Sequence, residues 1–201
     1  MKHQQFLYAL AAMLLAIALS PPAFAQGSSQ DGGGEIATLY ALDALTSHLS
    51  LNDGKPGAVI HGNLLFNRDS QLSFDTYTRD SFRVGIQGGE QGVIVDLGSA
   101  DELRSRYGYS ETVGNAQGFT SIHLEDGRAM IVKDYRTKTF QLLREFDELG
   151  RDRVGGDTAP VVVGHTYLVR IKENGKVTTN AKLKVLAFVP GQYVTIRWSR
   201  L

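Results

Sequence analysis

The sequence predicts a mainly β fold, either an antiparallel sandwich or a partly open barrel, with one short helix. Three observations lead to this prediction. Apolar and polar residues alternate with a period of two in several segments, as in strands that bury one face. Turn dipeptides that contain glycine separate these segments. Only one segment has the residues that begin and end a helix.

The first 25 residues have the three parts of an export signal. Lys2 precedes an apolar stretch over residues 6–19, and Ala23-Phe24-Ala25 supplies small residues for cleavage before Gln26. The apolar stretch is shorter than the ~20 residues that a membrane-spanning helix needs. We therefore expect a bacterial protein, secreted or periplasmic, with no transmembrane segment after cleavage.

The rest of the chain divides into three parts. Residues 26–34 are polar and glycine-rich, which predicts a flexible leader. A β-rich domain is expected over residues 35–150, and three further strands over residues 161–201 belong either to the same domain or to a small separate module. The chain has no cysteine, so disulfides, a thiol nucleophile and a cysteine-ligated metal are excluded.

Within the β-rich domain, the elements follow from local patterns. Residues 35–51 have apolar side chains three apart, which favours a helix although the spacing drifts. Residues 72–77 and 82–86 alternate as half-buried strands, and the apolar segment 93–97 indicates a central strand. Asp126-Gly127 predicts a hairpin because type I′ turns prefer this dipeptide.

The one helix is predicted over Ser99–Tyr107. Ser99 is followed three residues later by Glu102, which is the pattern of a capping box. Asp101 and Glu102 lie where the helix dipole favours negative charge, and Gly108 is a suitable end.

No strong catalytic motif is present. The sequence lacks Gly-x-Ser-x-Gly, Ser-x-x-Lys, His-Glu-x-x-His and the glycine-rich phosphate loops. His165 is in phase with Tyr167, which predicts a buried histidine with a hydrogen-bonded partner; a ligand or general-base role is the alternative. We expect no cofactor and no metal.

Charge is distributed unevenly along the chain. Residues 161–201 have seven basic side chains and one acidic, whereas residues 26–160 have 13 basic and 20 acidic. The net charge of zero therefore hides two parts of opposite sign.

The last two strands, joined by Pro190-Gly191, are expected to pair Phe188 with Tyr193 and hence Lys184 with Arg197. Such like charges directly opposite each other destabilise a sheet by about 0.2–1 kcal/mol. Solvent screening, the acidic part of the chain or an anionic partner would offset this cost.

Two registers compete for the preceding hairpin. A tight Asn174-Gly175 turn would set Tyr167 opposite Lys182, so that the apolar side of one strand meets the polar side of the next. A shift of the register restores the agreement of faces. The preferred register pairs Arg170 with Lys184 and replaces the tight turn with a loose tip over residues 173–181. We prefer the shifted register because the buried face usually decides pairing.

This arrangement predicts a basic β-face with aromatic side chains that could stack on sugar rings. Its candidate binding residues are Arg170, Lys184, Arg197, Lys172, Lys182, Phe188 and Tyr193. Nucleic acid is not an expected partner for an exported, near-neutral chain.

We interpret the protein as a non-catalytic binding or interaction protein of the cell envelope. Its partner would be an anionic glycan, lipopolysaccharide phosphate or another protein. Two alternatives remain: a secreted hydrolase of envelope or extracellular polymers, with carboxylates assembled from distant strands, and a structural or assembly component. The sequence does not predict the oligomeric state.

Overall fold

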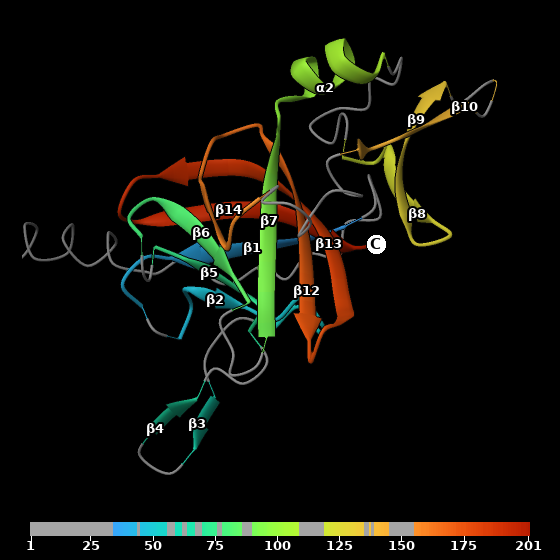
Figure 1. Cartoon of the computed structure of the whole chain (residues 1–201). Helices are drawn as coiled ribbons and strands as arrows, with labels where there is room; N and C mark the ends of the chain where they lie inside the picture. The colour runs from blue at the N-terminus through green and yellow to red at the C-terminus, as the bar shows by residue number, and fades with distance from the viewer. Residues whose placement is uncertain are drawn as a thin grey trace, which may run out of the picture.

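The structure is a computed structural model in which antiparallel sheets pack as a sandwich, with one short helix among the described residues (Figure 1). This confirms the predicted fold class. The predicted export signal lies outside the described residues, as does all of the leader except Gly34. The described residues are 34–43, 45–55, 59–61, 64–66, 70–75, 78–85, 90–108, 119–134, 137, 139–144 and 155–201.

The larger sheet, called the main sheet here, has five antiparallel strands. In spatial order they are β1 (Glu35–Tyr40), β14 (Tyr193–Arg200), β13 (Lys176–Val189), β12 (Thr166–Glu173) and β7 (Glu90–Gly98). The three C-terminal strands therefore form the centre of this sheet, and strands from the N-terminal part flank them on both sides.

A second, four-stranded sheet packs on the inner face of the main sheet. Its strands, in order, are β11 (Thr158–Pro160), β6 (Ser81–Val84), β5 (Leu72–Phe74) and β2 (His48–Leu49). The core between the sheets includes Phe74, Phe82, Tyr167, Leu183 and Trp198, all buried. A separate hairpin joins β3 (Val59–His61) to β4 (Leu64–Phe66).

The two sheets meet at one corner, where β6 and β7 come very close. Gly92 of β7 lies against the backbone of Val84 and Gly85, so that a Cβ at position 92 would overlap these atoms. Glycine is thus required here for a close approach of two backbones.

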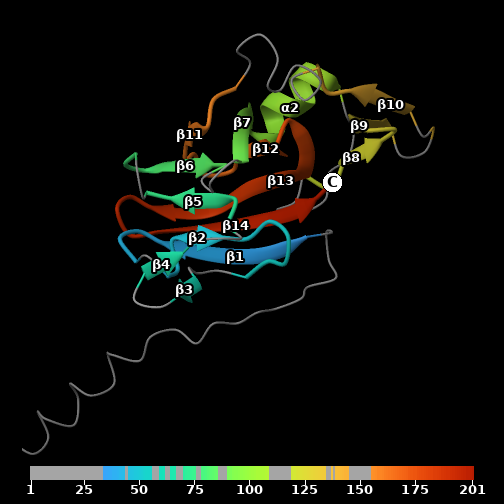
Figure 2. The same cartoon turned by 60° about the horizontal axis from the view of Figure 1, so that its bottom comes forward.

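The outer face of the main sheet is partly covered by two further elements. The helix α2 (Ala100–Tyr107) lies over it together with a meander of β8 (Ile122–Glu125), β9 (Arg128–Asp134) and β10 (Thr139–Leu142) (Figures 1 and 2). These elements and the sheet enclose a second core, whose buried members are Leu97, Leu103, Tyr107, Ile122, Ala129, Ile131, Leu143 and Leu168.

The helix that begins after Ser99 and the hairpin at Asp126-Gly127 form as their local sequences predicted. The Ser99 N–H donates to Glu102 Oε2 at 2.6 Å, and the Glu102 N–H donates to Ser99 Oγ at 3.2 Å, which completes the capping box. Asp126 and Gly127 both have positive φ, 49° and 73°, in the turn between β8 and β9.

Among the described residues, no helix is long and apolar enough to cross a membrane.

The segment 35–51, whose apolar spacing favoured a helix but left its structure ambiguous, contains the strands β1 and β2. Its threefold apolar spacing does not define a buried face: Leu39 is buried, whereas Leu42 is 90% exposed and Leu45 is 44% exposed. Pairing of residues 35–40 with β14 instead sets a period of two.

The preferred register of the hairpin between β12 and β13 is also wrong. The tight turn forms, with Asn174 and Gly175 at φ 50° and 78°, and Arg170 pairs with Asn180. A β-bulge at Thr178 shifts the register between the turn and the centre of the hairpin. The extra residue allows the favoured turn and the buried face to coexist.

A second bulge changes the hairpin between β13 and β14. Leu186 is the extra residue, so Tyr193 pairs with Val189 and not with Phe188, which corrects the prediction. Beyond the bulge Lys184 pairs with Arg197, as predicted.

Candidate functional site

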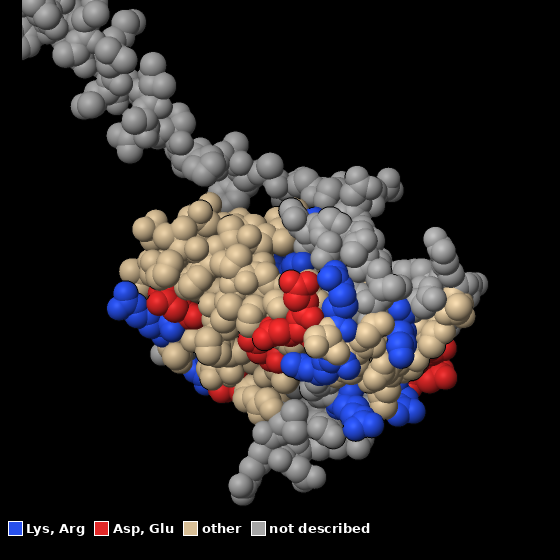
Figure 3. Space-filling model, turned by 90° about the horizontal axis from the view of Figure 1, so that it is seen from above, with Lys and Arg blue, Asp and Glu red and all other residues tan. Residues whose placement is uncertain are grey.

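The outer face of the main sheet has a covered half and an open half. The covered half lies beneath α2 and the β8–β10 meander. The open half consists of half-buried or exposed residues of β1, β13 and β14: Ile36, Thr38, Tyr40, Ala187, Val189, Tyr193, Thr195 and Arg197. Figure 3 views this side of the molecule and shows a wide uncharged area beside a band of acidic and basic side chains.

Two tyrosines form the aromatic part of the open half. Tyr40 and Tyr193 pair across β1 and β14, and their ring centroids are 6.2 Å apart at a tilt of 50°. The hydroxyls of Thr38 and Thr195 are hydrogen-bonded at 3.0 Å in the next pair of the same face. Tyr193 was predicted as a site residue, whereas Tyr40 was missed because the apolar spacing of its segment was ambiguous and did not indicate a strand.

Phe188 does not belong to this surface. The bulge at Leu186 reverses the side on which the following residues point, so Phe188 packs against the inner core. Its ring contacts Phe74 edge to face, with centroids 6.1 Å apart. The prediction that Phe188 shares a face with Lys184 is therefore wrong.

Lys182 is buried as well, with 6% of its surface exposed. Its Nζ donates to the carbonyl oxygens of Phe119 at 2.7 Å and Ile122 at 2.6 Å. The ammonium also lies 4.5 Å from the centroid of the Phe119 ring, within range of a cation–π interaction. Lys182 thus attaches the meander to the sheet and does not form part of an exposed binding surface.

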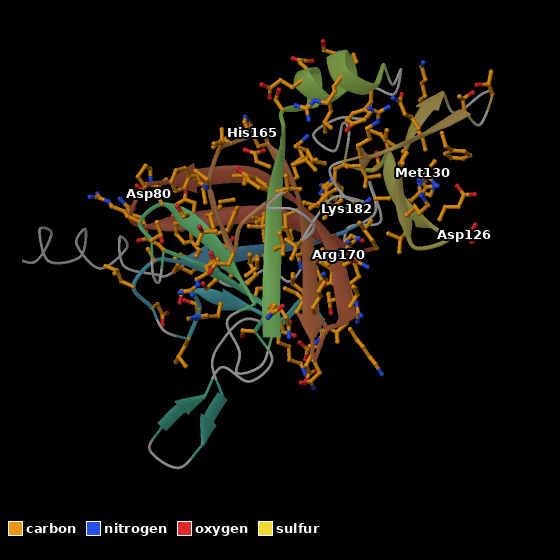
Figure 4. All side chains as sticks on the ribbon, in the orientation of Figure 1. Asp80, Asp126, Met130, His165, Arg170 and Lys182 are labelled. Carbon is orange, nitrogen blue, oxygen red and sulfur yellow. The ribbon has the colours of Figure 1, made fainter. Side chains whose placement is uncertain are left out.

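Arg170 and Lys172 lie apart from the other predicted cations. Arg170 donates from Nε to Asn180 Oδ1 at 3.3 Å and is four residues from Thr166 along β12, about 13 Å at ~3.3 Å per residue. Figure 4 shows Arg170 and Lys182 at different positions along the sheet. The predicted line of Arg170, Lys184 and Arg197 across the sheet does not form.

Lys184 and Arg197 do lie side by side, at the border between the two halves. Across the sheet the order of partners is Thr166, Lys184, Arg197, and we call these three residues the cationic row. Lys184 is 7% exposed. Burial lowers the pKa of its ammonium, and the neighbouring Arg197 lowers the pKa further.

Two polar atoms of the cationic row are buried without a hydrogen-bond partner in the described structure. They are Arg197 Nε and Thr166 Oγ1, and Thr166 has none of its surface exposed. Because most buried polar atoms in proteins are hydrogen-bonded, two such atoms in one row are unusual.

His165 directly precedes Thr166, the first residue of β12. Its Nδ1 lies 2.9 Å from Asp96 Oδ2, and the side chain is 23% exposed. The expected hydrogen-bonded partner is therefore present, although the side chain is not fully buried. Among the residues that the structure describes, no group of three or more His, Asp or Glu is placed to hold a metal ion.

Comparisons of this chain with protein-family models, curated proteins and solved structures found no match.

Proposed function

We propose that this protein is an exported, non-catalytic binding protein of the bacterial envelope that recognises an acidic polysaccharide through the open half of the main sheet. The observation that favours this function is the Tyr40–Tyr193 pair on the same strand face as Arg197, in the half of the outer face that no other described element covers. The predicted export signal favours the location.

The chemistry of the open half suits a sugar chain. Tyrosine rings offer an apolar face with a polar tip, so they can contact the C–H face of a sugar and its hydroxyls together. Thr38 and Thr195 add hydroxyls between the rings and Arg197. None of the described residues of the open half is acidic, so they do not repel an anionic chain.

The length of the surface indicates more than one sugar unit. Tyr193 and Arg197 are four residues apart on β14, about 13 Å at ~3.3 Å per residue. This span is longer than a single sugar ring. A ligand that stacks on Tyr193 and reaches Arg197 must therefore be an oligomer.

Affinity chromatography of the protein beginning at Gln26 tests the proposal. Tyr40→Ala and Tyr193→Ala should each weaken retention on an immobilised acidic polysaccharide by about fivefold or more, as for truncation of a central aromatic contact. Phe140→Ala is the matched control, because Phe140 is an aromatic residue with 41% exposure on β10, outside the open half. Equal retention of all three variants and the parent protein would refute the proposal.

A hydrolase is the second candidate, and the Asp96–His165 pair is the observation that favours it. A carboxylate bound to Nδ1 orients a histidine and fixes its tautomer, as in catalytic dyads. Release of reducing ends from a polysaccharide by the parent protein, and its loss in Asp96→Asn, would favour this candidate over a binding protein.

A further inference from the structure

We infer that β1 is a dimerisation edge, through which two copies of this chain join their main sheets into one continuous antiparallel sheet. The β1 strands of the two copies run antiparallel to each other about a two-fold axis at Thr38. The inference rests on the outer edge of this strand and not on the proposed function.

The first argument is the open backbone edge of β1. The strand lies at one margin of the main sheet, and among the described strands it pairs with β14 (Figure 2). The Ala41 N–H donates to the Gln192 carbonyl at 2.7 Å, and in an antiparallel pair every second residue before Ala41 faces β14 in the same way. The backbone groups of Ile36 and Thr38 therefore point away from the sheet, where no described residue bonds to them.

The opposite margin of the main sheet is closed by other parts of the molecule. The Ile94 N–H of β7 donates to the Gly156 carbonyl at 2.8 Å, and Gly92 lies against the end of β6. On the outer edge of β1, the one backbone hydrogen bond among the described residues runs from the Tyr40 N–H to the Thr46 carbonyl at 3.2 Å, at the end of the strand. A further strand can therefore add to the main sheet at β1 and not at β7.

The second argument is that β1 lacks the features that prevent edge pairing. Edge strands in natural proteins are commonly protected by lysine, by proline or by a β-bulge. The strand Glu35–Tyr40 contains no lysine and no proline, and it pairs with β14 without a register shift. The formal net charge of the chain is zero, so two copies do not repel each other strongly.

The third argument is that β1 is complementary to itself. A two-fold axis at Thr38 sets Ile36 of each copy opposite Tyr40 of the other copy. Ile36 is 41% exposed and Tyr40 is half-buried, on the same face of the strand. A β-branched and an aromatic side chain in direct cross-strand contact stabilise a sheet, and this pair would occur twice. Glu35, the one charged residue of β1, would lie opposite Ala41 and not opposite another carboxylate.

Exposed apolar residues at the two ends of β1 favour a second copy as the occupant. Leu42 and Leu45 follow the strand and are 90% and 44% exposed, although leucine is usually buried. In the two-fold arrangement, Ile36 near the start of β1 in one copy lies beside this turn in the other copy. The two copies would therefore shield apolar surface at both ends of the strand, which a strand of unrelated sequence does not provide.

Sedimentation equilibrium over a range of concentrations, without polysaccharide, tests for the dimer. The protein beginning at Gln26 should approach twice the mass of one chain as its concentration rises. Thr38→Pro should raise the dissociation constant of the dimer at least tenfold, because proline has no N–H to donate at the axis. The outward N–H of Thr38 makes no bond to β14, so an edge strand tolerates proline there. Thr38→Val is the matched control: both variants lose the hydroxyl that bonds to Thr195, but valine keeps the N–H and should remain dimeric.

Ile36→Lys tests the same edge without a change in the backbone. A lysine on an edge strand disfavours pairing, so this variant should also raise the dissociation constant at least tenfold, with its fold verified by circular dichroism. A parent protein that is monomeric up to its solubility limit, or that forms an assembly of another size, would overturn the inference. A dimer that neither folded variant weakens would overturn it as well.

Single cysteines locate the axis, because the chain has no cysteine of its own. In a hydrogen-bonded antiparallel pair the two Cα atoms at position 38 would be about 5.5 Å apart, a distance that a disulfide spans. Thr38→Cys should therefore form a covalent dimer under mild oxidation. Thr195→Cys is the control on the neighbouring strand, because its counterpart would be three strand spacings away, about 14 Å at ~4.8 Å each. Equal cross-linking of the two variants, or none at position 38, would overturn the inference.

Discussion

Two buried lysines on one strand should respond in opposite directions to the same substitution. Lys182 and Lys184 are two residues apart on β13, share the outer face and are 6% and 7% exposed. Lys182 donates to two backbone carbonyls and contacts an aromatic ring, whereas Lys184 lies opposite Arg197. We expect Lys182→Met to destabilise the protein and Lys184→Met to stabilise it.

The magnitudes follow from these contacts. A hydrogen bond to a charged group contributes about 1.5–3 kcal/mol, so two such bonds would contribute about 3–6 kcal/mol. The lower end applies to Lys182, because the Phe119 carbonyl keeps a bond from the Ile122 N–H and methionine keeps the packing of the stem. We therefore expect Lys182→Met to lower the free energy of unfolding by about 3 kcal/mol. Removal of like-charge repulsion in Lys184→Met should raise it by about 0.2–1 kcal/mol.

Urea denaturation followed by tryptophan fluorescence measures both changes, because Trp198, the single tryptophan, is in the inner core. Hydrogen exchange then locates the effect. Lys182→Met should increase exchange in β8 and β9 more than in β5 and β6, since the lysine attaches the meander and not the second sheet. Equal destabilisation by the two variants, or equal exchange in both regions, would refute this account of the two lysines.

Three further predictions concern the corner, the helix and alkaline pH. Gly92→Ala should lower the free energy of unfolding, measured by urea denaturation, by about 1–3 kcal/mol, because its Cβ would overlap the neighbouring strand. Gly156→Ala is the control, because a Cβ at position 156 would make only ordinary van der Waals contacts. Ser99→Ala should cost about 1 kcal/mol through loss of the helix cap. Hydrogen bonds from Ser99 lower the pKa of the Glu102 carboxyl group in the folded state. The stabilising contribution of the carboxylate is therefore present above its unfolded pKa and is lost as the pH falls through the lower folded pKa. In thermal unfolding between pH 7 and pH 3, Ser99→Ala should lose less stability on acidification than the parent protein. The pKa of Lys184 is lowered in the folded state, so its ammonium loses a proton at a lower pH in the folded state than in the unfolded state. The free energy of unfolding should therefore rise with pH just below the normal lysine pKa. Thermal unfolding of Lys184→Met should not show this rise.

Much of the secondary structure could be predicted because its signals are local. Ser99 and Glu102 are three residues apart and satisfy each other within one turn of helix. Asp126-Gly127 forms its turn because these two residues tolerate positive φ. The pairing of Lys184 with Arg197 was predicted correctly, although the expected pairing of Phe188 with Tyr193 was wrong.

The candidate site could be predicted only in part, because single inserted residues decide which side of a sheet a side chain faces. The bulge at Leu186 moves Phe188 to the inner core, and the tight turn together with the bulge at Thr178 pairs Arg170 with Asn180 and not with Lys184. Each bulge reconciles the register that the turn sets with the register that the buried face requires, and this depends on the whole hairpin. Alternation of apolar and polar residues along one strand does not indicate where such an extra residue lies.

The amino-acid order alone determined the class of the fold, its helix cap, its tight turns and the positive charge of the last strands. These properties depend on backbone preferences and on neighbours within a few residues. Only the tertiary structure decided which cationic side chains remain near solvent. Lys182 is buried because it bonds to the carbonyls of Phe119 and Ile122, which are 63 and 60 residues away in the sequence. Burial is a property of the whole packed molecule, so the same residue type on one strand became an internal attachment at Lys182 and a cross-strand neighbour of Arg197 at Lys184.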